Sequence, residues 1–279
     1  MFVFLNGQFV PEEQATVSVF DRSFLYGDGL FETMRVTKGK PFRWWEHMER
    51  LRKGGDFLGI KIPFACKALE KFAAELIAKN QMPDALLRLT VSRGVGLRGY
   101  SPKGADKPIV VMTLHPFPGA PASSLARWKL VTASFRLPAG EKLAHFKTAN
   151  KLAQILARTE ADAAGADEAL LCNTDGFVVE GASSNLFWVE GDTICTPPLA
   201  SGILAGVTRA VTLELCAQLG LPCAEKQITP VELRRVTGVF VTLSSFGVVA
   251  AVSLDGAELK QSLLVDKLSS AYAELLASS

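Results

Sequence analysis

The sequence is poor in the residue types that build metal centres and disulfides. It has three histidines, which lie far apart, and five cysteines, an odd number without a Cys-x-x-Cys pair. No His-Glu-x-x-His motif and no Cys/His cluster with zinc-ligand spacing occurs. We therefore expect no metal site, and we expect the cysteines to be free, mostly buried thiols of a protein from the reducing cytoplasm.

The sequence also lacks long hydrophobic runs and a strong charge of either sign. Its net charge is +2 without a dense basic run, which argues against nucleic acid or an anionic membrane as a partner. The longest apolar run, Val239–Leu254, is interrupted by Ser244, Ser245 and Gly247, so it is not a membrane span. The apolar start, Met1–Leu5, has no basic residues and is too short for a signal peptide.

Common nucleotide and hydrolase motifs are absent as well. There is no Walker A sequence and no G-x-S-x-G elbow. Gly94, Gly96 and Gly99 match the dinucleotide pattern G-x-G-x-x-G, but Pro102 and Gly104 prevent the helix that this pattern must open. We therefore interpret this stretch as a loop, and a nucleotide-binding or purely structural module remains the alternative to an enzyme.

What is present is the pattern of a mixed α/β protein with a sizeable core. With 279 residues, 48% hydrophobic and 21% charged, the chain can form one large domain or two small ones. A proline-rich segment predicts a boundary, with a domain over 1–115, a linker over 116–125 and a second domain over 126–279. The hydrophobic periodicity predicts strands at 2–5, 8–10, 30–36, 85–92, 108–114, 129–134, 168–172, 177–179, 186–189, 238–243 and 248–254, and helices at 45–58, 66–77, 207–219 and from 264.

Lys147 precedes another predicted helix. Apolar positions follow it at helical spacing, at Leu152, Ile155, Leu156 and Thr159. Thr148 or Asn150 can cap the helix, which would place Lys147 just ahead of its positive end. A cation is disfavoured there, so the neutral amine that forms a Schiff base is easier to reach. An ordinary solvated surface lysine is the alternative.

Two further segments point to an anionic, ring-shaped ligand. Glu180 ends a strand-like run, and no Lys or Arg lies between Thr174 and Leu204 to pair with it. A carboxylate between apolar strands is costly unless it has a partner, and the protonated ring nitrogen of a ligand would serve. The glycine turn Gly202–Gly206 opens the helix at Val207, where bare N–H groups bind phosphate in many proteins.

Together these segments resemble the class IV family of pyridoxal-phosphate (PLP) enzymes, which includes aminotransferases and 4-amino-4-deoxychorismate lyase. The resemblance rests on Lys147, on Glu180-Gly-Ala-Ser-Ser-Asn-Leu-Phe187, on Ile194-Cys-Thr196 and on Leu204-Ala-Gly-Val-Thr-Arg209. It implies fold type IV, with a small α/β domain and a larger barrel-like α/β domain. It also implies a homodimer.

The resemblance further implies a set of cofactor residues. Lys147 would hold PLP and move protons, and Glu180 would bond the pyridine nitrogen. The other residues with an implied contact to PLP are Arg50, Leu204, Val207, Thr208, Ser244 and Ser245. An ordinary i,i+4 surface pair with Glu46 is the alternative for Arg50.

Phe31, Arg98 and Tyr100 are the expected substrate residues. Phe31 matches the family's pocket aromatic, although plain core would fit it equally, and Arg98 offers a fork for a carboxylate. Arg98-Gly-Tyr100 looks closest to the lyase, since D-amino-acid aminotransferases carry histidine where Tyr100 stands. We therefore expect a lyase that forms 4-aminobenzoate, a folate precursor, from a carboxylate-bearing substrate. The alternative is an aminotransferase that acts on D-amino acids or branched-chain L-amino acids.

Overall fold

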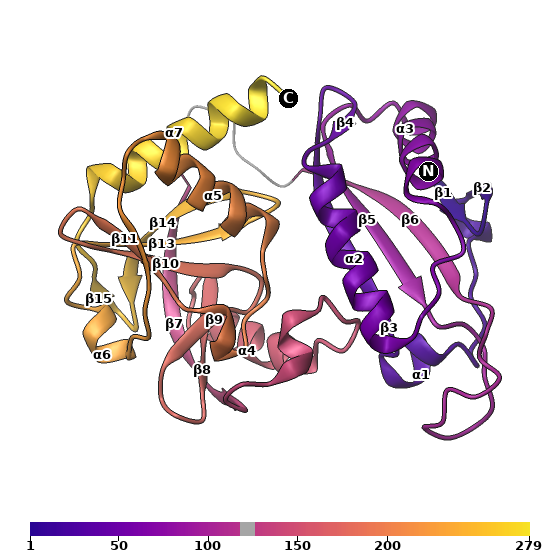
Figure 1. Ribbon diagram of the computed structural model, residues 1–279, viewed down its shortest axis with the longest axis horizontal. Coiled ribbons are helices and arrows are strands. Elements are labelled where there is room, and N and C mark those ends of the chain that lie inside the picture. Colours follow the sequence, from indigo (N-terminus) through magenta and orange to yellow (C-terminus); the bar gives the residue numbers. More distant parts are fainter. Residues whose placement is uncertain (118–125) are drawn as a thin grey trace. The chain divides into compact units, whose positions relative to one another are not determined.

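The computed structural model describes residues 1–117 and 126–279, and the chain forms two compact units. The first unit comprises Met1–Pro118, Phe146–Lys151 and Ser279; the second comprises Gly119–His145 and Leu152–Ser278. Figure 1 shows each unit as a sheet with helices against it. The segment 146–151 thus belongs to the first unit, although it falls inside the predicted domain 126–279. Most of the predicted linker, from 118 to 125, lies outside the described residues.

The first unit is a six-stranded sheet with two long helices on one face. Its strand order is β2-β1-β6-β5-β3-β4, and each neighbouring pair is antiparallel. The strands are β1 (Phe2–Leu5), β2 (Gln8–Pro11), β3 (Gly29–Thr37), β4 (Lys40–Pro41), β5 (Ala85–Ser92) and β6 (Ile109–Pro116). The helices are η1 (Glu12–Gln14), α1 (Arg22–Tyr26), α2 (Trp44–Leu58) and α3 (Cys66–Asn80). Figure 1 shows α2 and α3 along the same sheet face.

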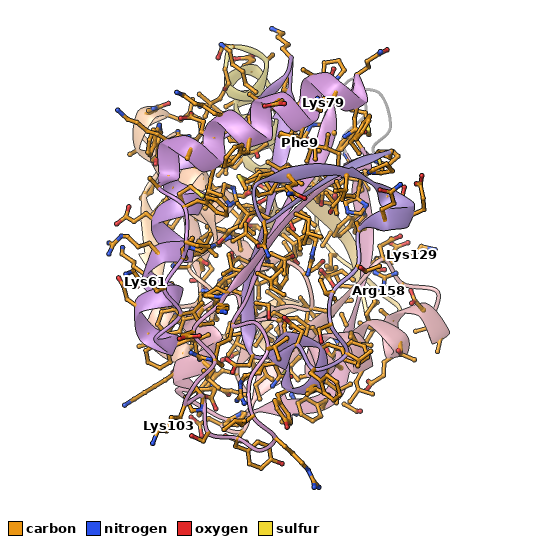
Figure 2. The ribbon with its side chains drawn as sticks, turned by 90° about the vertical axis from the view of Figure 1, so that its right-hand side faces the viewer. Phe9, Lys61, Lys79, Lys103, Lys129 and Arg158 are labelled. Atoms are coloured by element: carbon orange, nitrogen blue, oxygen red, sulfur yellow. The ribbon has the colours of Figure 1, made fainter. Side chains whose placement is uncertain are left out.

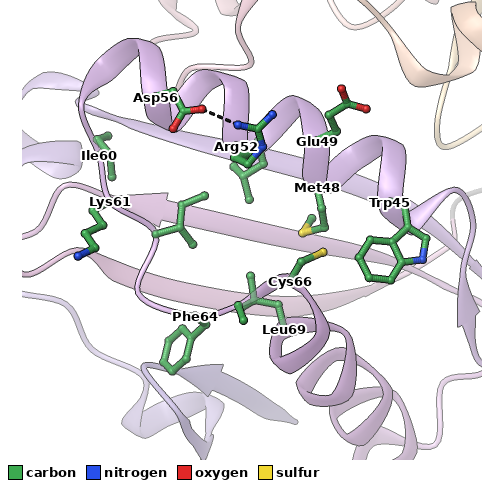
Figure 3. A pocket seen from close by; sticks show the side chains of 13 residues that line it. Trp45, Met48, Glu49, Arg52, Asp56, Ile60, Lys61, Phe64, Cys66 and Leu69 are labelled. Atoms are coloured by element: carbon green, nitrogen blue, oxygen red, sulfur yellow. Dashed lines mark hydrogen bonds and ion pairs between the residues drawn. The ribbon is translucent and has the colours of Figure 1, made fainter.

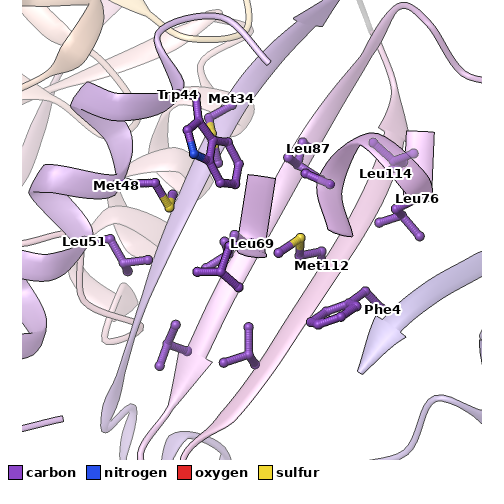
Figure 4. Close-up of a cluster of buried hydrophobic side chains, with 14 of the residues drawn as sticks. Phe4, Met34, Trp44, Met48, Leu51, Leu69, Leu76, Leu87, Met112 and Leu114 are labelled. Atoms are coloured by element: carbon purple, nitrogen blue, oxygen red, sulfur yellow. The ribbon is translucent and has the colours of Figure 1, made fainter. Parts of the chain in front are cut away.

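Strand alternation decides which side chains form the core of this unit. Leu87 and Leu89 of β5 are fully buried against the helices. Figure 4 shows Leu87 in this cluster together with Met34 and Met112 from the neighbouring strands. Residues between these positions point to the other face of the sheet. The second face therefore presents polar and basic side chains, among them Thr33 and Arg88.

A cation–aromatic contact joins α3 to the outer strand β2 of the first unit. The ammonium of Lys79, on α3, lies 5.4 Å from the ring centre of Phe9, on β2, and Figure 2 shows both residues at the same end of the unit. Such a contact at an exposed site contributes about 0.5–1 kcal/mol. It helps to hold the outer strand pair β1–β2 against α3.

The segment that carries Lys147 pairs with the first residues of β3 and so extends the same sheet. The N–H of Phe31 donates to the Lys147 carbonyl at 3.0 Å, and the N–H of Ala149 donates to the Gly29 carbonyl at 2.8 Å. An isolated bridge between Leu30 and Thr148 completes the pairing. Lys147 is therefore held by strand-type pairing and not by a helix end.

The second unit is built on a nine-stranded sheet that closes on itself. The strand order is β12-β11-β10-β13-β14-β7-β8-β9, and β9 also pairs with β10. The ring of strands is thus β10-β13-β14-β7-β8-β9, as expected for the barrel-like domain. The strands are β7 (Arg127–Leu137), β8 (Glu168–Asn173), β9 (Val178–Gly181), β10 (Asn185–Glu190), β11 (Thr193–Thr196), β12 (Cys223–Glu225), β13 (Gly238–Leu243), β14 (Gly247–Leu254) and β15 (Ala257–Glu258).

Helices cover this barrel. They are η2 (Lys142–His145), α4 (Leu152–Ala163), η3 (Leu199–Ser201), α5 (Val207–Gln218), α6 (Pro230–Leu233) and α7 (Leu263–Ala277). The helix α4 forms where the apolar spacing predicted one, but Leu152 and Ile155 of that spacing are exposed, whereas Ala157 and Ala161 are fully buried. Small side chains let the helix approach the sheet closely, and this packing outweighs the pattern of the larger residues.

The described residues contain no helix that is long and apolar enough to cross a membrane. All five cysteines are free; Cys172, Cys195 and Cys216 are buried, and Cys223 is exposed. Within the described part of the chain, no group of three or more His, Cys, Asp or Glu side chains could hold a metal ion.

Candidate active site

Lys147 and Phe31 meet in the first unit, on the sheet face opposite the helices. The Lys147 ammonium lies 4.7 Å from the centre of the Phe31 ring. The helix expected at this lysine begins at Leu152, five residues later. The predicted helix is present, but Lys147 is not directly ahead of it, because residues 147–149 pair with the start of β3.

Arg88 is a third member of this group that the sequence interpretation missed. Arg88 and Thr33 are cross-strand partners, so Arg88 lies on the Phe31 face, and its guanidinium carbon is 3.9 Å from the ring centre. Burial lowers the pKa of Arg88, and no carboxylate among the described residues forms an ion pair with it. In the sequence, Arg88 could have been recognised as the single arginine inside the apolar strand Ala85–Ser92. This cation is suited to an anionic ligand.

Arg50 lies on the opposite face of the same sheet, in a buried ionic network. Its Nε and Nη2 donate to the two carboxylate oxygens of Glu32, at 2.8 Å and 2.5 Å. His47 Nδ1 lies 2.7 Å from the same carboxylate. Glu46 pairs with Arg43 at 2.9 Å, and Arg50 is held by the buried Glu32. Arg50 is thus fixed in position by a carboxylate that has no contact with water.

The charges of this network support one another. Burial alone would raise the pKa of Glu32, but the charge and hydrogen bonds of Arg50, together with His47, lower it to about 2. Burial also lowers the pKa of His47 against the pull of Glu32, which favours the neutral imidazole near neutral pH. The network therefore contains one anion and one permanent cation.

Replacing Glu32 with glutamine should destabilise the first unit by about 3–5 kcal/mol, because it leaves the Arg50 guanidinium buried without its anion. The opening free energy of β3 and α2 amides, from hydrogen exchange, measures this effect. The folded-state pKa lies below the ordinary value of 4.5. The advantage of the wild type is therefore complete above pH 4.5, declines below it, and is lost as the pH falls through about 2.

Glu49→Gln is the matched control for this prediction. Glu49 is in the same helix and pairs with Lys53 at 2.8 Å, but both side chains are more than half exposed. Surface ion pairs contribute little. Equal losses for the two variants would contradict the importance of the buried pair.

The two remaining substrate candidates of the first unit lie on the loop between β5 and β6. Arg98 is exposed, and Tyr100 is 88% exposed with its ring 5.7 Å from that of Tyr26. Neither makes a described contact with Lys147 or Phe31. The structure thus brings Phe31 to Lys147 but leaves Arg98 and Tyr100 as side chains that project from a loop.

Glu180 lies in the second unit, where the barrel closes. It pairs across the strands with Asn185, and Asn185 pairs in turn with Thr242. Glu180 Oε2 accepts from the Leu204 N–H at 3.0 Å and from Asn185 Nδ2 at 3.4 Å. Asn185 Nδ2 also donates to the Leu204 carbonyl at 2.9 Å. A buried carboxylate is therefore held in one orientation by the turn that leads to α5.

The residues of this unit that are predicted to bind phosphate follow directly after that turn. A Cβ on Gly206 would lie 1.9 Å from Asn185 Oδ1, so only glycine fits there, and no side chain caps α5. Val207 and Thr208 form the first, buried turn of this helix. Its N–H groups are thus available to an anion. Ser244 and Ser245 lie in the turn between β13 and β14, and both are half-buried.

The hydroxyl of Thr242 adds a further polar group. It is buried, it has no hydrogen-bond partner among the described residues, and it belongs to the face of Glu180 and Asn185 because directly paired residues share a face. Buried polar atoms without partners are rare. A fixed acid, an uncapped helix and an unpaired hydroxyl fit the pyridine ring and phosphate of PLP.

A separate cavity of about 590 Å³ lies in the first unit, beside α2 and the start of α3 (Figure 3). Its floor is apolar and includes Met48, Phe64 and Leu69. At its rim Arg52 Nη1 donates to Asp56 Oδ2 at 2.8 Å. None of the predicted site residues lines this cavity.

Comparison with known proteins agrees with the chemistry of these groups. The sequence model of amino-transferase class IV matches residues 29–254. A putative branched-chain-amino-acid aminotransferase of Methanocaldococcus jannaschii is 37% identical over 257 residues, which cover 92% of this chain and 88% of the relative.

Solved structures of related enzymes are similar to this chain over almost its whole length. The 4-amino-4-deoxychorismate lyase of Pseudomonas aeruginosa is 35% identical with a TM-score of 0.86, and 99% of each chain is covered. A T.th. branched-chain amino acid aminotransferase, solved with pyridoxamine 5'-phosphate, is 29% identical with a TM-score of 0.92, over 99% of this chain and 94% of that one. The expected fold is thereby confirmed. The chain belongs to the class IV aminotransferase family and is a PLP-dependent enzyme.

Proposed function

We propose that this enzyme is a 4-amino-4-deoxychorismate lyase, which eliminates pyruvate from its substrate and leaves 4-aminobenzoate. The observation that carries the proposal is the shared Phe31 ring, with the Lys147 amine at 4.7 Å and the Arg88 guanidinium at 3.9 Å. A reactive amine beside a cation without a carboxylate partner suits an amino compound that also bears a carboxylate.

The substrate of the lyase carries two carboxylates, one on the ring and one on the enolpyruvyl group. We assign Arg88 to one of them and Arg98, on its exposed loop, to the other. Phe31 would pack against the apolar part of the substrate, and Tyr100 would border it beside Arg98. The Arg98-Gly99-Tyr100 sequence supports this assignment, since it is the part of the chain that looks closest to the lyases.

In the proposed mechanism Lys147 holds PLP and then carries protons. When bound, PLP withdraws electrons from the carbon that bears the substrate amino group. Lys147 would take the proton from that carbon, the C–O bond on the adjacent carbon would break, and the enolpyruvate that leaves would take up a proton on its methylene carbon to become pyruvate. Glu180, fixed by Leu204 and Asn185, bonds the pyridine nitrogen and keeps it protonated. The proposal requires Lys147 and Glu180 to serve the same cofactor molecule.

The phosphate of PLP would be bound by charge and by backbone donors. We propose the N–H groups of Val207 and Thr208 with the Thr208 hydroxyl, Ser244 or Ser245, and the guanidinium of Arg50. Leu204 would pack under the ring. The Glu32 carboxylate already holds Arg50 by two hydrogen bonds, so this arginine would be oriented before the cofactor arrives.

A class IV aminotransferase is the second candidate. The 37% identity to the relative from Methanocaldococcus jannaschii favours it, and it would use Lys147 and Glu180 in the same way. It would differ in its substrates, which would be D-amino acids or branched-chain L-amino acids with 2-oxoglutarate. For either activity we propose a homodimer, which sizing of the purified protein tests.

Two assays separate the candidates. With aminodeoxychorismate, the lyase should release 4-aminobenzoate and pyruvate in equal amounts, and the Lys147→Ala protein provides the blank. In the second assay, D- and L-amino acids are supplied with 2-oxoglutarate, and slow side transamination is compatible with the proposal. Rapid transamination without any 4-aminobenzoate would reject the lyase and establish the aminotransferase.

A further inference from the structure

The loop of residues 94–104, between β5 and β6, has a fixed backbone and projecting side chains. Leu97 is 76% exposed and Tyr100 is 88% exposed, so these side chains contribute little to the core. The entry of the loop is nevertheless tightly packed, since a Cβ on Gly94 would lie 2.0 Å from the Lys107 carbonyl. Something other than its own side chains must therefore hold the loop in shape.

That role falls to a buried arginine from a distant part of the sequence. The Arg22 side chain is 4% exposed and donates to three consecutive loop carbonyls. Nη1 donates to Gly99 at 2.9 Å and to Ser101 at 3.2 Å, and Nη2 donates to Tyr100 at 3.1 Å. One rigid guanidinium thus fixes the backbone on both sides of Tyr100 and directly after Arg98.

The charge of Arg22 is balanced inside the same cluster. Its Nε donates to Asp28 at 2.8 Å, and Asp28 also accepts from Arg93 Nε at 2.7 Å. Both arginines hold the pKa of the Asp28 carboxyl below its ordinary value against the effect of burial. Charge-assisted hydrogen bonds in a dry site are stronger than neutral ones, and a lysine ammonium cannot reproduce the planar fork.

Helix α1 supports the arginine and touches the loop itself. The Arg22 guanidinium lies 5.0 Å from the Tyr26 ring, and the Tyr26 hydroxyl accepts from the Gly99 N–H at 3.2 Å. Asp21 caps this helix and bridges to Val95 at the loop entry. Helix α1 and its cap residue therefore contact the loop backbone through Asp21, Arg22 and Tyr26.

We propose that Arg22 is a positioning residue for substrate specificity: it holds the 94–104 loop so that Arg98 and Tyr100 are presented in one geometry. The proposal rests on the proposed function, because that function assigns Arg98 to a substrate carboxylate. Arg22 itself touches neither substrate nor cofactor in this account. Its effect passes only through the loop backbone.

Limited proteolysis of the whole PLP-loaded enzyme tests, without any substrate, whether Arg22 holds the 94–104 loop. Trypsin can cut after the exposed Arg98, and the fixed loop should resist cleavage. In Arg22→Lys this cut should become about 10-fold faster or more, because several hydrogen bonds of the charged group are lost. Tyr26→Phe, a milder change that removes one bond, should act in the same direction, and it serves if Arg22→Lys does not fold.

Arg93→Lys is the matched control. Arg93 is also buried and shares Asp28, but the other bonds of its side chain go to the carbonyls of Leu58 and Gly59. The Arg93→Lys variant should have a lower free energy of unfolding but no selective rise in the rate of cleavage after Arg98. Equal acceleration in Arg93→Lys and Arg22→Lys would overturn the proposal.

Kinetics provide a readout that a merely structural role would not move. Arg22→Lys should raise KM by about 10-fold with a smaller change in kcat, and the visible spectrum of bound PLP should stay unchanged. Adding Arg98→Ala to Arg22→Lys should cost little more than either change alone, because both act on one interaction. Additive losses would contradict the proposal. If the wild type proves to be an aminotransferase, the lyase assignment fails, and the proteolysis arm still decides the role of Arg22.

Discussion

Replacing Lys147 with alanine is expected to abolish the covalent attachment of PLP and to lower kcat by ~10⁴-fold or more, at the upper end of what a proton-transfer group contributes. The structure holds this lysine by backbone pairing, through its carbonyl and the N–H of Phe31. The substitution removes the side-chain amine and leaves this pairing in place. The fold should therefore survive, and the loss should be one of chemistry.

Steady-state rates and the visible absorbance of lysine-bound PLP measure this loss. Lys142→Ala is a suitable control, since Lys142 is an exposed lysine of the same stretch of sequence. It should behave as the wild type. Turnover at the native rate in Lys147→Ala would remove Lys147 from the mechanism.

Glu180→Gln is the second change with a large expected effect. Glutamine has nearly the same shape, and its amide oxygen can still accept the Leu204 N–H that Glu180 accepts at 3.0 Å. It carries no charge, so it cannot keep the pyridine nitrogen protonated. The variant should bind PLP but lose about 10²–10³-fold in kcat, the scale of one preorganised electrostatic partner.

The matched control for this variant is Glu190→Gln. Glu190 belongs to the neighbouring strand β10, is 39% exposed, and pairs with Lys226 at 2.7 Å. Its substitution should leave kcat close to the wild type. If Glu180→Gln also keeps near-native activity while it retains PLP, Glu180 has no part in the activation of the cofactor.

The strands and helices of this protein could largely be predicted from local pattern. The alternation of Leu87, Leu89 and Val91 marks a half-buried strand, and the structure buries these side chains completely. The helices α2 and α3 begin within one residue of the predicted positions 45 and 66. Short-range periodicity is sufficient for elements of this kind, because each buries one face.

The contacts that build the candidate site could not be predicted in this way. Lys147 is held by Phe31, and Arg22 by the carbonyls of the 94–104 loop, across large distances in sequence. No local pattern carries such pairings, which depend on how the sheet is assembled. The same limit explains α4, whose larger apolar residues suggested a buried face that the alanines occupy instead.

The most direct test of the account identifies the lysine that carries the cofactor. The PLP-loaded enzyme is treated with borohydride, which fixes the bond between the lysine nitrogen and the cofactor, and the digested protein is mapped by mass spectrometry. We predict a single modified peptide with the pyridoxyl group on Lys147, in the wild type and in Glu180→Gln alike. Modification of a different lysine, or no modification of a protein that retains PLP, would contradict the account.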